Sequence, residues 1–85
     1  MLNEFRNKID KIDKEIVMLL GAREEISEKI GDLKKRKGIE IQDVNREIEL
    51  IKALEKIGEK KGLDQVYIND IFQIILKRSK KIQNG

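Results

Sequence analysis

The sequence predicts an all-α chain of three helices, one long and two shorter. Its 85 residues contain no proline and only six glycines, so few positions oppose a helical backbone. Apolar residues, chiefly isoleucine and leucine, recur at intervals of three and four, which is the helical period. No internal repeat or linker divides the chain, and we therefore expect residues 1–85 to form a single domain.

The long first helix is expected over residues 2–37. Apolar side chains keep the helical spacing along it: Leu2, Phe5, Ile9, Ile12, Ile16, Leu19, Ile26, Ile30 and Leu33. Its last turn contains four consecutive basic residues followed by Gly38. Cations favour the helix dipole at a C-terminus, and glycine adopts the left-handed cap at little cost, so the helix should end here.

This helix is too long for a compact domain of its own. A stretch of this length extends about 50 Å, whereas a compact chain of this size is roughly 30 Å across. We therefore expect a second copy of the chain to cover the apolar stripe of the first helix.

The second helix is expected over residues 43–59, after a short link at residues 38–42. Asp43 is the predicted N-cap, because its side chain can accept a hydrogen bond from the first turn. Lys60, Lys61 and Gly62 would end the helix. The inner face would contain Val44, Ile48, Ile51, Leu54 and Ile57.

The third helix is expected to begin after a cap at Asp64 and to reach about Gln83. Its inward side chains would be Ile68, Phe72, Ile75 and Ile82. The helix is also unusually basic near its end, with Lys77, Arg78, Lys80 and Lys81. These four cations could raise the attraction of a binding site for a dianion or simply decorate the surface, and we favour decoration.

Composition excludes several function classes. The chain has no cysteine and no histidine, which removes disulfides, thiolate and histidine metal sites, and Ser-His or Cys-His nucleophilic pairs. Charged residues make up 41% of the chain, but the net charge is only +3, a balance typical of a solvated helical surface. No apolar run suits a membrane span or a signal peptide. We expect a cytoplasmic protein with no nucleic-acid or membrane partner.

Polar residues interrupt the apolar stripes at four positions. Arg23 lies on the seam of the first helix, Glu47 on the inner side of the second, and Ser79 and Gln83 on the inner face of the third. An unpaired charge in such a core costs several kcal/mol, so these residues need partners. One interpretation is purely structural: Arg23 pairs with Glu47, while Ser79 and Gln83 bond to backbone or water.

Lys34 favours a second interpretation. It lies 11 residues after Arg23, which is three turns along the helix and only about 20° around it. Two cations on one face, converging with Glu47, Ser79 and Gln83, would outline a pocket for a small polyanion. Taken alone, Lys34 has a simpler explanation as a last-turn cation that favours the helix dipole.

Asp43, Arg46 and Glu47 share one side of the first turn of the second helix. They either cap the helix and form a solvated ion pair, or they surround backbone N–H groups that point at a ligand oxygen. Arg6 lies 17 residues before Arg23, about 25 Å along the axis. The two arginines of one chain cannot hold the same ligand, so Arg6 would have to act from a second chain.

Over essentially its whole length the sequence resembles the all-helical chorismate mutases, the AroQ class. The matching segments are residues 5–9, 12–13, 20–24, Lys34, 43–47, 67–68, 71–75, Ser79 and Gln83. The resemblance implies an intertwined two-fold homodimer, a six-helix bundle built around paired long first helices. Each of its two identical sites would combine one chain's residues with the partner's Arg6.

The resemblance also implies the activity. Chorismate would be converted to prephenate by an intramolecular Claisen rearrangement, a step of phenylalanine and tyrosine biosynthesis that needs neither metal nor cofactor. Arg23 and the partner's Arg6 would clamp the two substrate carboxylates. Lys34 would contact a carboxylate and the ether oxygen, and Gln83 would donate to the same oxygen.

The remaining residues of the implied site would surround the ring of the substrate. Glu47 and the backbone N–H of Asp43 would hold the ring hydroxyl, and Ser79 and Arg46 would complete the polar wall. Two alternatives stay open: a lyase of the same fold that removes pyruvate from isochorismate, and a basic helical module for dimerisation or nucleic-acid binding. The seam position of Arg23 favours an enzyme, because nucleic-acid binding would gather cations on an outer face.

Overall fold

A computed structural model confirms the all-α chain of three helices and describes residues 1–39 and 43–85. Helix α1 spans Leu2–Lys37, α2 spans Val44–Lys60 and α3 spans Gln65–Asn84. The predicted range of α1 is confirmed, and α2 and α3 lie within one residue of their predicted limits. Part of the predicted link, residues 40–42, lies outside the described residues.

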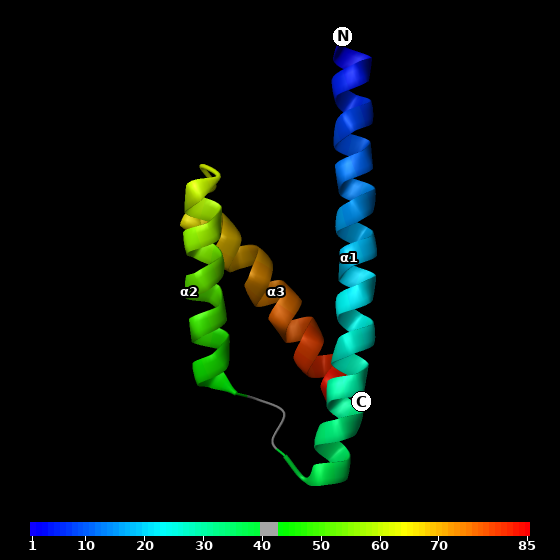
Figure 1. The fold of residues 1–85 in the computed structure, drawn as a ribbon, viewed down its shortest axis with the longest axis vertical. Helices are drawn as coiled ribbons and strands as arrows, with labels where there is room; N and C mark the ends of the chain where they lie inside the picture. The colour runs from blue at the N-terminus through cyan, green and yellow to red at the C-terminus, as the bar shows by residue number, and fades with distance from the viewer. Residues whose placement is uncertain (40–42) are drawn as a thin grey trace.

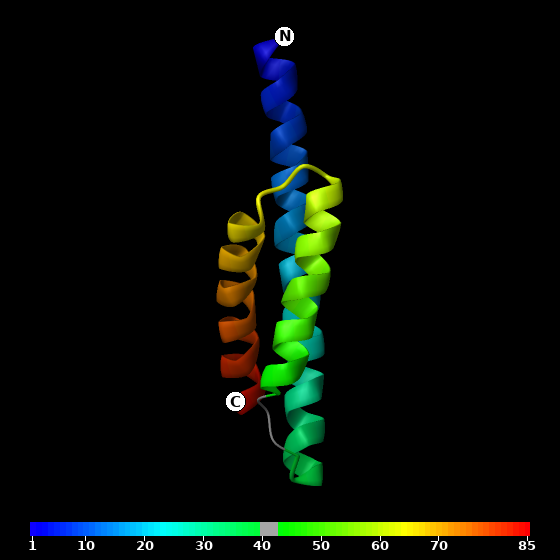
Figure 2. The ribbon, with the colours of Figure 1, turned by 90° about the vertical axis from the view of Figure 1, so that its left-hand side faces the viewer.

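The helices form an elongated arrangement measuring 55 × 23 × 15 Å. Helix α3 crosses between α1 and α2 and packs against both, whereas the backbones of α1 and α2 stay apart within the described residues (Figure 1). The N-terminal part of α1 projects beyond the other two helices in both views, and the C-terminus lies beside the second half of α1 (Figures 1 and 2). This crossing brings α3 close to the polar positions of both neighbours.

The end of α1 follows from its sequence. Gly38 adopts the left-handed conformation with φ of 67°, and its N–H donates to the carbonyl of Lys34. The N–H of Ile39 donates to the same carbonyl at 3.0 Å. These bonds satisfy a carbonyl that would otherwise have no helical partner, as predicted from the glycine after the basic turn.

Aspartates cap the two shorter helices. The Asp43 carboxylate accepts a hydrogen bond from the N–H of Arg46 at 3.1 Å, and Asp64 accepts from the N–H of Val66 at 2.7 Å. Gly62, with φ of 76°, allows the tight turn between the helices. Both predicted caps are confirmed, and the cap at Asp43 fixes the residue at which α2 begins.

The apolar core within one chain is small. Ile51 of α2 and Ile68 and Leu76 of α3 are its buried apolar side chains among the described residues. Gly58 brings α2 close to α3, since a Cβ at that position would lie only 3.0 Å from Cγ1 of Ile68. A single chain therefore buries little apolar surface, which favours association.

The apolar stripe of α1 is exposed in the single chain. Ile9, Ile12 and Leu19 are 58%, 56% and 69% exposed. A contiguous apolar surface of this kind marks an interaction site in most proteins. None of the described helices combines the length and apolar character required to cross a membrane.

Candidate active site

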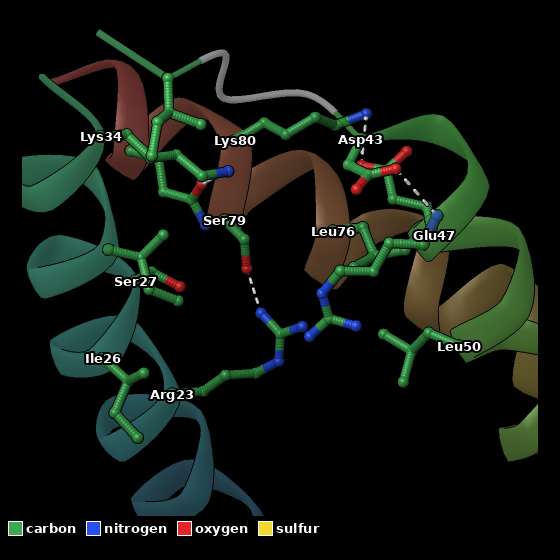
Figure 3. A pocket seen from close by; sticks show the side chains of 14 residues that line it. Arg23, Ile26, Ser27, Lys34, Asp43, Glu47, Leu50, Leu76, Ser79 and Lys80 are labelled. Carbon is green, nitrogen blue, oxygen red and sulfur yellow. Dashed lines mark hydrogen bonds and ion pairs between the residues drawn. The ribbon is translucent and has the colours of Figure 1, made fainter. Parts of the chain in front are cut away.

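A pocket of about 470 Å³ lies where α1, α3 and the start of α2 converge (Figure 3). This volume suits a small organic ligand. The pocket brings together seven of the eight residues singled out in the sequence: Arg23, Lys34, Asp43, Arg46, Glu47, Ser79 and Gln83. These residues come from all three helices and are separated by up to 60 positions in the chain.

Arg6 is the exception among the described residues. It is exposed in the second turn of α1 and does not line this pocket. Its separation of about 25 Å from Arg23 along the helix axis prevents both side chains from reaching one ligand. Its contribution to a partner's site remains a prediction.

Arg23 extends from α1 toward α3 and is half-buried. Its Nη1 donates a hydrogen bond to Oγ of the buried Ser79 (Figure 3). Burial, and to a smaller extent the charge of Arg46, lowers the pKa of Arg23. Arginine nevertheless keeps its proton in proteins. The pocket thus holds a partly desolvated cation beside a second cation, an arrangement that an anionic ligand would stabilise.

Lys34 and Gln83 meet where the end of α3 touches α1. The Nζ of Lys34 donates to Oε1 of Gln83 at 3.4 Å, which leaves the amide NH₂ group of Gln83 as a donor toward a ligand. Gly31 permits this approach, because a Cβ there would lie only 2.8 Å from the Cα and carbonyl oxygen of Gln83. The small residue at position 31 therefore allows the backbone of Gln83 to lie close to α1.

Glu47 forms an ion pair with Lys80 of α3, with 3.2 Å between Oε1 and Nζ. Lys80 also lines the pocket, so the expectation that it only decorates the surface is wrong. Its long side chain extends from α3 to α2 (Figure 3). It takes this direction because its ion-pair partner, Glu47, lies on α2. Arg78, by contrast, pairs with Glu24 at 2.8 Å between two exposed side chains.

These partners differ from the purely structural interpretation of the sequence. The ion pair of Glu47 is with Lys80, and the hydrogen bond of Arg23 is with Ser79. The capping role of Asp43 is confirmed by its bond to the first turn of α2. The idea that N–H groups at this helix start also bind a ligand stays a prediction.

Sequence reasoning missed several lining residues, among them Ser27, Leu76 and Lys80. Ser27 is buried and lies four residues after Arg23 on the same face of α1, and Leu76 lies three residues before Ser79. Residues at these spacings share a helix face. A search for residues one turn away from Arg23 and Ser79 would therefore have found Ser27 and Leu76.

The lining side chains carry an excess of positive charge. Within the described part of the chain, four cationic side chains face two carboxylates around the pocket: Arg23, Lys34, Arg46 and Lys80 against Asp43 and Glu47. Such a balance attracts anions and raises their local concentration. The geometry and the charge together fit a small molecule with more than one negative group.

Comparison with known proteins identifies the family. The sequence profile of the chorismate mutase type II family matches residues 5–84, nearly the whole chain. The chain belongs to the chorismate mutase type II family. This membership confirms the resemblance noted in the sequence, together with the all-α fold expected from it.

Similar proteins include both single and bifunctional relatives. The chorismate mutase of Methanocaldococcus jannaschii is 32% identical over 82 residues, which cover 96% of this chain and 83% of that protein. The bifunctional chorismate mutase/prephenate dehydratase of Buchnera aphidicola subsp. Baizongia pistaciae is 39% identical over 75 residues, covering 88% of this chain and 20% of that protein. The corresponding bifunctional protein of Escherichia coli strain K12 is 32% identical over 74 residues. The chain thus spans about a fifth of the length of these bifunctional relatives.

Proposed function

We propose that this chain rearranges chorismate to prephenate in the pocket between α1, α3 and the start of α2. The observation that carries the proposal is the convergence of Arg23, Lys34 and Gln83 on one cation-rich cavity. Membership of the chorismate mutase type II family supports the proposal, because chorismate is a small dicarboxylate and the cavity is rich in cations.

The reaction is an intramolecular Claisen rearrangement. The ether C–O bond breaks while a C–C bond forms, and the protein forms no covalent bond to the substrate. Arg23 would bind one carboxylate and Arg6 of the partner subunit the other, holding the enolpyruvyl group over the ring. Fixing the reacting ends in this geometry lowers the entropic part of the barrier.

Electrostatic stabilisation supplies the second contribution. Negative charge grows on the ether oxygen as its bond to the ring breaks, so donors aimed at this atom bind the transition state more tightly than the ground state. Lys34 and Gln83 are these donors in our proposal. The 3.4 Å hydrogen bond between them supports it, because the amide oxygen faces Lys34 and the amide NH₂ is left for the substrate.

The other polar residues have supporting roles. Glu47 and the backbone N–H of Asp43 would bind the ring hydroxyl of the substrate. Ser79 accepts a hydrogen bond from Arg23 and would hold its guanidinium in place, while Arg46 would add positive charge to the pocket wall. None of these groups exchanges a proton with the substrate in this mechanism.

The proposal includes a homodimer. The exposed apolar stripe of α1 supports it, since two-fold pairing of this helix would bury the stripe in an isologous interface. The same pairing would carry each Arg6 toward the pocket of the other chain. We further propose a role in cytoplasmic phenylalanine and tyrosine biosynthesis, which agrees with relatives whose names join this activity to prephenate dehydratase.

Product analysis with two substrates tests the proposed function. The purified chain is incubated separately with chorismate and isochorismate, and products are followed by NMR, because prephenate has the same mass as chorismate. We expect chorismate to disappear as prephenate forms, with no pyruvate released from isochorismate. Pyruvate release without any prephenate would favour the lyase alternative, and loss of neither substrate would overturn the proposal.

A further inference from the structure

Lys80 differs from the other basic residues near the end of α3. Among the described residues of this basic stretch, Lys77 and Lys81 are exposed, and Arg78 pairs with Glu24 outside the pocket. The side chain of Lys80 is only 35% exposed, and it extends from α3 toward the start of α2 (Figure 3). It adds a positive charge to the pocket at a position that the proposed mechanism does not use.

The partner of Lys80 is Glu47, whose side chain is 22% exposed. Nζ of Lys80 lies 3.2 Å from Oε1 of Glu47, so one oxygen of the carboxylate is engaged and the second can accept another hydrogen bond. A partly buried pair is screened less by solvent than a surface pair. Lys80 therefore restricts the orientation of the Glu47 carboxylate.

The contact also connects two helices at the site. Glu47 lies in the first turn of α2, whose backbone packs against α3 and stays apart from the backbone of α1 within the described residues. Because α3 packs against both α1 and α2, it contributes to the position of Glu47 relative to Arg23 and Lys34. An ion pair between α3 and this first turn is well placed to keep the carboxylate at its working distance from the α1 cations.

We propose that Lys80 is a positioning residue for the reaction. Its ammonium group holds Glu47 through Oε1 and leaves the other carboxylate oxygen to accept a hydrogen bond from the hydroxyl of the ligand. This inference rests on the proposed function, in which Glu47 binds the ring hydroxyl of chorismate. Lys80 acts through Glu47 and not on the substrate carboxylates.

A double-mutant cycle tests this role. We compare kcat and KM for chorismate in the wild type, Lys80→Met, Glu47→Gln and the double variant, with circular dichroism to verify folding. Lys80→Met should lower kcat/KM about tenfold in the wild-type background, and by less than about twofold when Glu47→Gln is present, because coupled residues are not additive. Lys80→Arg should recover most of the loss.

Lys77→Met is the matched control, since it removes the same charge from an exposed position of the same helix. It should leave kcat/KM unchanged. Calorimetric titration with prephenate gives a Kd for each of the four proteins of the cycle. These values report the coupling between Lys80 and Glu47 even if Glu47→Gln turns over too slowly for kinetics.

Two results would overturn the inference: full activity in Lys80→Met, or an equal loss in both backgrounds, which would mean that Lys80 acts without Glu47. A wild-type chain inactive on chorismate would instead refute the proposed function itself. The two failures are therefore distinguishable.

Discussion

Arg23 and Lys34 are each held by a neighbouring side chain on α3. Arg23 donates to Ser79, and Lys34 donates to Gln83 at 3.4 Å. Donors fixed in advance need little reorganisation when charge develops on the substrate, which makes their electrostatic effect large. At the residue scale, we therefore expect a donor to the ether oxygen to contribute more to kcat than a residue that only supports such a donor.

Replacing Lys34 by alanine should lower kcat far more than replacing Ser79. Loss of a donor to the developing oxyanion costs on the order of 10²–10³-fold in kcat, whereas Ser79→Ala removes only a support for Arg23 and should cost about tenfold or less. Steady-state kinetics with chorismate measures both. Equal and small losses would contradict the electrostatic role of Lys34.

Activity should be nearly independent of pH through the neutral range. The amide of Gln83 does not titrate, and Arg23 is active in its protonated form. Burial, followed by the charge of Arg46, lowers the pKa of Arg23, but arginine keeps its proton in proteins, so Arg23 should stay charged and kcat/KM should stay flat through the neutral range. A pH–rate profile with a sharp acid optimum would count against these assignments.

At the scale of the elements, the first turn of α2 combines structure with function. Asp43 caps the helix and lines the pocket, whereas Asp64 caps α3 away from the residues that line it. The two caps are chemically alike, because each carboxylate accepts a backbone N–H of its own first turn. They therefore offer a matched pair for separating stability from activity.

Asp43→Ala and Asp64→Ala should each lower the free energy of unfolding by about 0.5–2 kcal/mol, the usual cost of a lost N-cap. Only Asp43→Ala should also reduce kcat/KM, because the start of α2 would shift beside the ligand. Urea denaturation and kinetics on the same samples measure both effects. Equal loss of activity in the two variants would show that the start of α2 has no special role.

The helices were predictable because their signals are local. Gly38, Asp43 and Asp64 each act on a neighbouring turn of backbone, and the structure confirms all three. The inner face of α3 was harder to predict, since this helix packs against two neighbours and its apolar residues surround much of it. No single apolar stripe points to Leu76, and only its spacing of three residues from Ser79 indicates that it lies on the same face.

Part of the candidate site could also be predicted from the sequence, but for a different reason. Arg23 and Ser79 stand where apolar residues belong, so a single helical stripe reveals them. Lys80 shows no such signal, because a lysine on a basic surface and a lysine in a pocket look alike in the sequence. The direction of its long side chain depends on Glu47 of another helix, which only the tertiary structure provides.

At the scale of the whole molecule, the shape of the single chain is the main observation. Its radius of gyration is 15.8 Å, whereas a compact chain of this length has about 12 Å. The N-terminal part of α1 stands apart from the other helices (Figure 1) and exposes an apolar stripe. A second copy of the chain would bury this stripe and supply Arg6 to the pocket.

Placing a charge on the stripe should prevent dimerisation. Ile12→Glu would bury an unpaired carboxylate in the proposed interface, a cost of several kcal/mol, and should yield a monomer with little activity. Lys14→Glu alters a position about 200° around the helix from Ile12 and serves as the control. Sedimentation velocity measures the oligomeric state, and a dimeric, active Ile12→Glu variant would exclude this interface.

Complementation between two inactive variants tests the central claim most directly. Arg6→Ala and Arg23→Ala each disable both sites of a homodimer, but a mixed dimer contains one site in which Arg23 of one chain meets the partner's Arg6. After complete subunit exchange, about a quarter of the sites are intact in such a two-fold assembly. We expect mixing to restore about a quarter of the wild-type chorismate mutase activity. Confirmed subunit exchange with no recovery of activity would contradict this expectation.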